Sequence, residues 1–157
     1  LEEAARRGVE VLLPIDHVVG AELAPDVQVE FCQTVEIPAA KMALDIGPKT
    51  ITEFEAAIGS ARTIIWNGPM GVFEIESCAR GTLKIAQAVA ASGATSVVGG
   101  GDSAAAVRLA GVGDSITHVS TGGGASLALL SGKPLPAFEV LTNREKEETQ
   151  AICREDH

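Results

Sequence analysis

The chain has few aromatic residues, few basic residues and no long apolar run. Its 157 residues include four phenylalanines, one tryptophan and no tyrosine. The 21 acidic residues outnumber the 12 lysines and arginines, so the formal net charge is −9. Because nucleic acid would have to bind against that negative field, we expect no nucleic-acid partner. No apolar run approaches the length of a membrane span, and the N-terminus is rich in charge, so we expect no membrane segment and no signal peptide.

Cysteine is scarce as well. Cys32, Cys78 and Cys153 are widely spaced and odd in number, which gives neither a metal-ligand pattern nor a disulfide framework. We therefore expect small buried or incidental thiols in a reducing compartment. Hydrophobic residues make up 46% of the chain and charged residues 21%, a balance typical of a soluble globular domain with a sizeable core.

Short β-branched runs alternate along the chain with longer segments in which apolar residues recur every three or four positions. This alternation predicts strands at residues 9–14, 42–47, 63–66, 94–101 and 116–120. Between them it predicts a helix that begins at Thr50, with Glu53 completing a capping box, and a helix that runs into the early nineties. Two further helices are predicted at 102–111 and 122–132. Apolar strands separated by helices indicate an α/β fold, with a parallel sheet covered by helices on both faces.

In such a sheet, ligands bind beyond the carboxyl ends of the strands, where the strand-to-helix loops gather. The predicted loops are DIGPKT (45–50), NGPMGVFE (67–74), GGGDS (99–103) and STGGGAS (120–126). Three of the four are rich in glycine, which lets the backbone approach a ligand closely. These loops are therefore the candidate binding site.

The GGGDS loop feeds a strand into a helix N-terminus, where unpaired amides and the positive end of the helix dipole attract anions. Taken alone, the loop is equally consistent with a tight turn in which Asp102 caps the helix. The next strand end repeats the design, with Ser120 and Thr121 followed by three glycines. Two such helix ends at one crevice suit an extended polyphosphate, and Asp102 is a candidate Mg²⁺ ligand. No G-x-x-x-x-G-K-[ST] motif is present, which excludes a P-loop nucleotidase.

The stretch WNGPMGVFE (66–74) combines the only tryptophan with two glycines and a proline. Pro69 fixes its own φ and favours an extended Gly68, so the chain leaves the strand on a defined path. Pro69 and Val72 are suited to border a flat apolar surface such as a base. Glu74 is suited to accept hydrogen bonds from ribose hydroxyls, and Asn67 to donate to a phosphate.

A competing interpretation assigns this stretch to structure alone. Trp66, Met70 and Phe73 would then belong to the core, and Glu74 would begin a helix, where a carboxylate is favoured. For Trp66 we favour the core. Of the remaining candidates, His118 is interpreted as a core histidine, His17 as a structural histidine and Lys49 as a solvated lysine.

The segments LLPIDHVV, DIGPKT, WNGPMGVFE, GGGDSAAA and HVSTGGGASLALLSGKPLP, in this order and spacing, resemble the C-terminal portion of the phosphoglycerate kinase family. The resemblance covers residues 1–142. It implies a two-domain glycolytic kinase that transfers a phosphoryl group between 1,3-bisphosphoglycerate and Mg-ADP, giving 3-phosphoglycerate and ATP. In that family the C-terminal domain binds the nucleotide. Residues 143–157 form a charged tail of unknown role, for which we favour a solvated helix.

The resemblance also implies roles for individual residues. Asn67 would contact the nucleotide phosphates, Pro69 and Val72 would border the adenine, and Glu74 would hold the ribose. The phosphate and magnesium loop would comprise Gly100, Gly101, Asp102 and Ser103. The helix end that faces the phosphoryl group in transfer would comprise Thr121, Gly122, Gly123 and Gly124.

The sequence lacks features of the family that precede these motifs. No N-terminal domain and no segment similar to GGAKV is present, so we expect a partial nucleotide-binding domain without its first βα units. Such a chain is expected to be inactive without the missing N-terminal part, and to self-associate through an uncovered strand edge. The family implies a cytoplasmic location, with a plastid or another organelle left open.

Two other functions are considered. A non-catalytic nucleotide-binding module would use the same loops without turnover. A Rossmann-type dehydrogenase fragment would explain GGGDSA but would leave NGPMGVFE and STGGGAS without a purpose.

Overall fold

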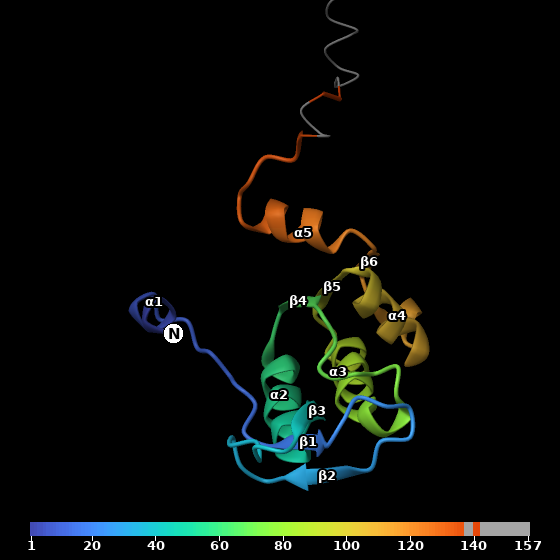
Figure 1. The fold of residues 1–157 in the computed structure, drawn as a ribbon. Helices are drawn as coiled ribbons and strands as arrows, with labels where there is room; N and C mark the ends of the chain where they lie inside the picture. Colours follow the sequence, from blue (N-terminus) through green and yellow to red (C-terminus); the bar gives the residue numbers. More distant parts are fainter. Residues whose placement is uncertain (137–139, 142–157) are drawn as a thin grey trace, which may run out of the picture. The chain divides into compact units, whose positions relative to one another are not determined.

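The computed structural model describes residues 1–136 and 140–141. The chain divides into two compact units, Leu1–Thr121 and Gly122–His157. The second unit contains α5 (Gly123–Leu130), and the first contains every other element in Figure 1. The predicted tail at 143–157 lies outside the described residues.

The helices of the first unit are α1 (Glu2–Arg6), α2 (Pro48–Ser60), α3 (Arg80–Ala91) and α4 (Gly101–Leu109), with 3₁₀ turns at Glu76–Cys78 and Gly113–Ser115. Its strands are β1 (His17–Gly20), β2 (Val29–Cys32), β3 (Met42–Ile46), β4 (Thr63–Asn67), β5 (Thr95–Gly99) and β6 (His118–Ser120). No helix of the described chain is long and apolar enough to cross a membrane.

Three strands form the predicted parallel sheet, in the order β4-β5-β6. The connections from β4 to β5 and from β5 to β6 each contain a helix, α3 and α4, as parallel neighbours require. The register aligns Asn67 with Gly99, and Gly99 with Ser120. The α/β class and the parallel sheet are therefore confirmed, and the last residues of the three strands stand side by side.

A second sheet was not predicted. β2, β1 and β3 pair in an antiparallel sheet with β1 in the centre. The strand at 42–46 was predicted correctly, but its assignment to the parallel sheet was wrong. The chain between β1 and β3 contains β2 and no helix, and a parallel pairing needs a crossover that such a connection does not supply. The DIGPKT loop therefore does not follow a strand of the parallel sheet.

Two other local predictions were wrong. Residues 9–14 form no strand in the described chain, and Val9, Val11 and Leu13 are exposed; β-branched composition makes a strand only where a neighbouring strand takes up its backbone hydrogen bonds. Helix α2 begins at Pro48 with Gly47 as its N-cap. Proline suits this first helical position because it has no amide to satisfy, so Thr50 lies inside the helix and forms no capping box.

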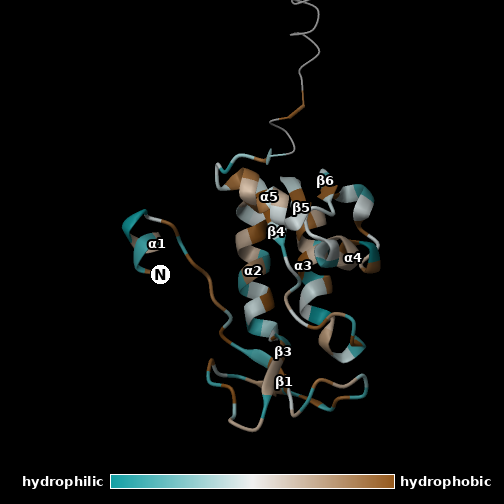
Figure 2. Cartoon of the chain, turned by 45° about the horizontal axis from the view of Figure 1, so that its top comes forward, coloured by the Kyte–Doolittle hydropathy of each residue, from teal (hydrophilic) through white to brown (hydrophobic). Residues whose placement is uncertain are grey.

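The hydrophobic core lies between the parallel sheet and helices α2, α3 and α4. Trp66 and Val98 face it from the sheet, whereas Ile65, on the opposite face of β4, is 49% exposed. The helix predicted to run into the early nineties is α3, and it has an apolar stripe: its N-cap Ala79, Ala86 and Val89 are buried, and Leu83 packs against them. Apolar and polar bands alternate along α2 and α3 in Figure 2, as helices with one buried face require.

The predicted ends of three helices are also confirmed. Gly93, Gly111 and Gly132 follow α3, α4 and α5 with φ of +69°, +68° and +72°. A residue without a Cβ takes this left-handed conformation at little cost and ends the helix.

Candidate functional site

The loops that leave the three parallel strands are tied to one another by hydrogen bonds. The amide of Gly68, in the loop after β4, donates to Oγ of Ser103 in α4 at 2.7 Å. The amide of Gly100, in the loop after β5, donates to the carbonyl of Ser120 at the end of β6, at 2.9 Å. The structure thus brings the NGPMGVFE and GGGDS loops together at one edge of the sheet, beside Ser120.

The side chain of Trp66 makes one of the hydrogen bonds that hold the 66–74 turn. Trp66 is 5% exposed, and its indole Nε1–H donates to the carbonyl of Gly68 at 2.7 Å. Gly68 has a φ of +106°, a conformation that glycine adopts far more readily than other residues. The core assignment of Trp66 is confirmed, but Gly68 is not held in an ordinary extended conformation by Pro69. The positive φ of the glycine itself redirects the chain.

Two further contacts fix the middle of the turn. Oγ1 of the buried Thr82, in the first turn of α3, accepts hydrogen bonds from the amides of Met70 at 3.0 Å and Gly71 at 3.2 Å. The amide of Val72 donates to the carbonyl of Leu44 in β3 at 2.8 Å. The backbone of the turn is therefore held by hydrogen bonds with the side chains of Trp66 and Thr82 and with the carbonyl of Leu44 in β3.

These contacts leave the predicted ligand-facing residues of the turn accessible. Asn67 and Glu74 are exposed, and Pro69 and Val72 are half-buried. Glu74 does not begin a helix, since α3 starts only at Arg80. The structural interpretation of Glu74 is therefore wrong, and its carboxylate lies on the surface of the turn.

The GGGDS loop opens α4 as predicted, but Asp102 is not its cap. Gly100 is the N-cap, with a φ of +101°, and Asp102 lies exposed in the first helical turn. The amides of Gly101, Asp102 and Ser103 have no intrahelical acceptor, because helical bonding begins with Ala104 donating to Gly100 at 3.0 Å. The exposed carboxylate of Asp102 thus lies beside backbone amides that are available to donate hydrogen bonds to an anion.

Ser103 differs from its neighbours because it is 1% exposed. Its oxygen accepts the Gly68 amide, so this side chain links the two loops. Gly101 and Thr121 are exposed and Gly100 is half-buried.

In the second unit, Gly122 is the N-cap of α5 and Gly123 and Gly124 form its first turn. The amide of Ser126 donates to the carbonyl of Gly122 at 3.0 Å, which begins the helical bonding. The three glycines therefore form a helix N-terminus, as predicted.

Within the described residues, no group of three or more His, Cys, Asp or Glu side chains lies close enough to hold a metal ion. This finding is compatible with Mg²⁺, which commonly takes one or two protein carboxylates and completes its coordination with water and phosphate oxygens. Asp102 fits that requirement, because its carboxylate is exposed in the first turn of α4, beside the backbone amides at the N-terminus of that helix.

Sequence reasoning missed two buried aspartates that position these elements. The carboxylate of Asp16 accepts hydrogen bonds at the start of α2 from the amides of Lys49 at 2.9 Å and Thr50 at 2.8 Å, and from Oγ1 of Thr50 at 2.6 Å. Burial pushes the pKa of Asp16 upward, but the hydrogen bonds from Thr50 and Lys49 outweigh it and leave the pKa below its ordinary value. Asp16 therefore caps α2 as a carboxylate.

The second buried aspartate, Asp45, belongs to β3 and contacts the first turn of α3. Its carboxylate accepts hydrogen bonds from the amides of Gly81 at 2.6 Å and Ile46 at 2.9 Å. Burial raises the pKa of Asp45 to about 6, although both hydrogen bonds lower it. Both aspartates were visible only as single acidic residues in apolar stretches, LLPIDHVV and MALDIG, and that was the one signal available.

Some side chains lie elsewhere than expected. His118 is exposed at the start of β6, so its interpretation as a core histidine was wrong. Lys49, by contrast, is exposed, which confirms its interpretation as a solvated lysine, and its amide donates to Asp16. Cys78 is fully buried, whereas the half-buried Cys32 directs its sulfur to the carbonyl of Glu36 at 3.2 Å. Cys153 lies outside the described residues.

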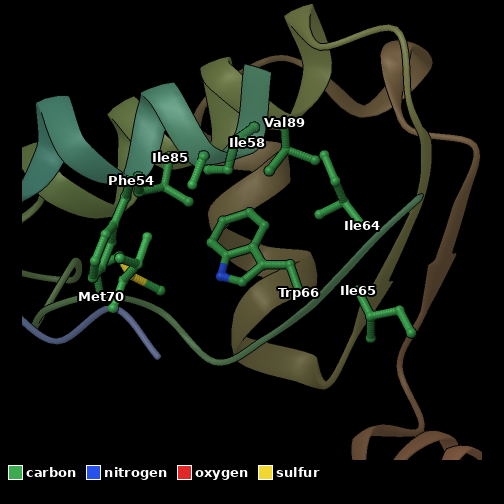
Figure 3. Close-up of a pocket in the computed structure, with 10 residues that line it drawn as sticks. Phe54, Ile58, Ile64, Ile65, Trp66, Met70, Ile85 and Val89 are labelled. Atoms are coloured by element: carbon green, nitrogen blue, oxygen red, sulfur yellow. The ribbon is translucent and has the colours of Figure 1, made fainter. Parts of the chain in front are cut away.

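An apolar cavity of about 220 Å³ lies beneath the turn. Figure 3 shows the Trp66 ring pointing toward Ile58 and Ile85, with Met70 and Phe54 at one end and Ile65 turned away from them. The cavity has few polar groups and therefore does not resemble a phosphate site. It is lined in part by the core residues Trp66, Ile85 and Val89.

Comparison with known proteins agrees with this arrangement. The family model described as phosphoglycerate kinase matches residues 1–133. A phosphoglycerate kinase of Koribacter versatilis is 58% identical over 148 residues, covering 92% of this chain and 36% of the relative. The enzyme of Clostridium beijerinckii is 53% identical over 141 residues, covering 90% of this chain and 36% of the relative.

Solved structures give the same result. The structure of phosphoglycerate kinase from Coxiella burnetii matches with a TM-score of 0.82 and 43% identity, covering 90% of this chain and 36% of that one. The enzyme from Pyrococcus horikoshii matches with a TM-score of 0.70 and 36% identity, over 80% of this chain and 31% of that one. The chain thus spans about a third of the length of the proteins it matches, and over that span its sequence motifs, its loops and its fold agree: it belongs to the phosphoglycerate kinase family.

Proposed function

We propose that this chain supplies the nucleotide side of a phosphoryl-transfer site that converts 1,3-bisphosphoglycerate and Mg-ADP to 3-phosphoglycerate and ATP. The observation that carries the proposal is the joining of the loops after β4 and β5 through Gly68 and Ser103. This joining sets the exposed Asp102 and the amides of α4 beside the turn that carries Pro69 and Glu74. A nucleotide has an apolar base, a ribose diol and charged phosphates, and the two loops offer a group for each.

The proposed roles follow from the chemistry and accessibility of the residues. Pro69 and Val72 present half-buried apolar surface to the adenine, and the exposed Glu74 accepts hydrogen bonds from the ribose hydroxyls. Asn67 contacts phosphate oxygens at the strand end. The amides of Gly100 and Gly101 bind phosphate, with Ser103 holding their loop in place and Thr121 exposed after β6.

Magnesium and the transferred group complete the proposal. Asp102 holds Mg²⁺, which when bound neutralises phosphate charge during transfer. In the second unit, the N-terminus of α5, formed by Gly122, Gly123 and Gly124, stabilises the charge of the phosphoryl group with backbone amides. Phosphoryl transfer requires positioning and charge stabilisation rather than a covalent nucleophile, and none of the proposed residues acts as one.

The acceptor side and the partner are part of the same proposal. We place the phosphoglycerate site in the N-terminal part that the family resemblance implies, so the isolated chain is expected to be inactive and to turn over only when that part is supplied. A cytoplasmic location fits a glycolytic role, and self-association through the exposed strand edge is expected of the isolated chain.

Titration calorimetry with Mg-ADP tests the nucleotide site directly. The expected result is binding weaker than about 1 µM, that is, less favourable than about −8 kcal/mol, because the family resemblance implies that the opposite wall of the site is supplied by residues other than these 157. Asp102→Asn is expected to weaken binding, and Asp114→Asn, at an exposed position in the 3₁₀ turn after α4, to leave it unchanged. Equal affinity of wild type and Asp102→Asn would contradict the assignment of the metal ligand.

A coupled assay separates catalysis from binding alone. ATP formation from 1,3-bisphosphoglycerate is expected to be absent with this chain and restored when the N-terminal part of a relative is added. Binding without restored turnover would favour the alternative function, a non-catalytic nucleotide-binding module. Turnover by the isolated chain would contradict the predicted inactivity.

A further inference from the structure

We propose that Asp45 is a positioning residue for the 67–74 turn, which it holds through the first turn of α3. The proposal rests on the proposed nucleotide site, since the turn carries the residues assigned to base and ribose. Asp45 itself is 3% exposed and touches no ligand. Its role would be to set where Pro69, Val72 and Glu74 stand.

The first link is a helix cap supplied from a distant strand. The N-cap of α3 is Ala79, whose side chain cannot accept a hydrogen bond. The carboxylate of Asp45 in β3 supplies the acceptor instead, taking the amide of Gly81 at 2.6 Å. Because an unsatisfied amide in the first turn of a buried helix is costly, the carboxylate fixes where α3 begins.

The second link passes from α3 to the turn. Thr82 follows the capped Gly81 and is fully buried. Its Oγ1 accepts the amides of Met70 and Gly71, the two residues at the centre of the turn. A displacement of the first turn of α3 therefore moves the acceptor for both amides.

The third link is direct packing. A Cβ added to Gly71 would lie 2.4 Å from Oδ1 of Asp45, and one added to Gly81 would lie 2.3 Å from the same atom. Both glycines thus have their Cα atoms against the carboxylate, which lies between the turn and the helix. The hydrogen bond from Val72 to Leu44, the neighbour of Asp45, closes the arrangement. A purely space-filling role would be served by an apolar side chain, which would not place an acceptor at Gly81.

Asp45→Asn tests the proposal because it keeps the volume of the side chain but replaces one acceptor oxygen by an NH₂ group. Amide hydrogen exchange is measured by segment in wild type, in Asp45→Asn and in the matched control Asp114→Asn. Exchange across 68–74 is expected to accelerate by about tenfold in Asp45→Asn. Exchange in β5 should stay at the wild-type rate, and Asp114→Asn should match wild type throughout. Fluorescence of Trp66, the only tryptophan, reports the same turn independently.

Gly71→Ala is the second variant, since its methyl group would lie 2.4 Å from Oδ1 of Asp45 and 2.5 Å from the carbonyl oxygen of Leu44. It would therefore push the turn off this part of β3 while leaving the Asp45 side chain itself unchanged. It is expected to loosen 68–74 as Asp45→Asn does. Unchanged exchange in both variants, or an equal acceleration in β5 and in the turn, would overturn the positioning role. If wild type binds Mg-ADP, Asp45→Asn should weaken binding about fivefold or more. A loosened turn with unchanged affinity would overturn the link to the nucleotide. If wild type did not bind Mg-ADP, that result would count against the proposed function alone, because amide hydrogen exchange would still decide whether Asp45 positions the turn.

Discussion

The cap of α2 gives a sharp test of how a distant carboxylate organises a helix. Gly47, the N-cap of α2, has a φ of −83°, so alanine fits its backbone without strain. A Cβ at this position would, however, lie 2.3 to 2.6 Å from three atoms of the Asp16 carboxylate. Gly47→Ala therefore displaces the carboxylate and its three hydrogen bonds to Lys49 and Thr50.

The size of the effect follows from what the carboxylate contributes. Loss of an N-cap costs about 0.5–2 kcal/mol, and loss of a charge-assisted hydrogen bond about 1.5–3 kcal/mol. These terms overlap, so we expect Gly47→Ala to lower the free energy of unfolding by about 2–4 kcal/mol. Gly59, in the same helix, has open space where its Cβ would be. Gly59→Ala is thus a matched control expected to raise stability by about 0.5–1 kcal/mol, because alanine is the better helix former.

Urea denaturation, followed by circular dichroism and Trp66 fluorescence, measures both variants. The decisive comparison repeats Gly47→Ala in an Asp16→Ala background, where its cost should fall to about 0.5 kcal/mol or less. An unchanged cost in that background would refute the reasoning, since the clash with the carboxylate could not then be its cause.

The sign of the pH dependence follows from the lowered pKa of Asp16. The stability that this group contributes is present above the pKa of the unfolded chain and is lost as pH falls through the lower pKa of the folded state. The difference between wild type and Asp16→Ala should therefore shrink in acid. A difference that grew in acid would contradict the carboxylate cap.

Three further predictions concern Asp45 and two residues of the candidate site. Asp45 has the opposite linkage, because its pKa of about 6 in the folded chain exceeds its ordinary pKa of 3.8. The stability that Asp45 contributes is therefore fully present below the pKa of the unfolded chain and is lost as pH rises through the pKa of the folded chain. The stability of wild type relative to Asp45→Asn should thus fall by about 2 kcal/mol between pH 4 and 7 in urea titrations; a flat difference would contradict a buried ionising carboxyl. Ser103→Ala leaves the Gly68 amide without its acceptor and should cost about 1–3 kcal/mol by the same measurement, whereas a neutral effect would show that the loops are not joined through this bond. Asp102→Asn should weaken Mg-ADP binding about tenfold while leaving metal-free ADP binding and stability unchanged; equal losses with and without Mg²⁺ would contradict a metal ligand.

The local features of the fold could be predicted because they depend on neighbours in sequence. The apolar stripe of α3 follows from side chains three and four residues apart, and Gly93 ends that helix through its own backbone freedom. Periodicity also identified β4, β5 and β6, and their alternation with helices indicated the parallel sheet. Residues 9–14 mark the limit of this reasoning, because a strand needs a partner that composition does not supply.

The candidate site was likewise predictable in part from the sequence. Glycine loops after strands indicated where a phosphate would bind, and the structure joins two of them through Gly68 and Ser103, 35 residues apart. That bond was not predictable, since Ser103 in the sequence was a candidate ligand with an unknown orientation. The structure shows it buried and turned toward the other loop.

The sequence by itself determined the order of strands and helices from β3 to α5, the glycine loops and the resemblance to a family, because each of these lies in a short continuous stretch of residues. Only the tertiary structure decided that β3 belongs to an antiparallel sheet and that Asp16 and Asp45 cap the helices α2 and α3. These contacts join residues 34 and 36 positions apart. Local periodicity extends only a few residues along the chain, whereas a buried carboxylate is held by whichever amides the folded chain brings to it.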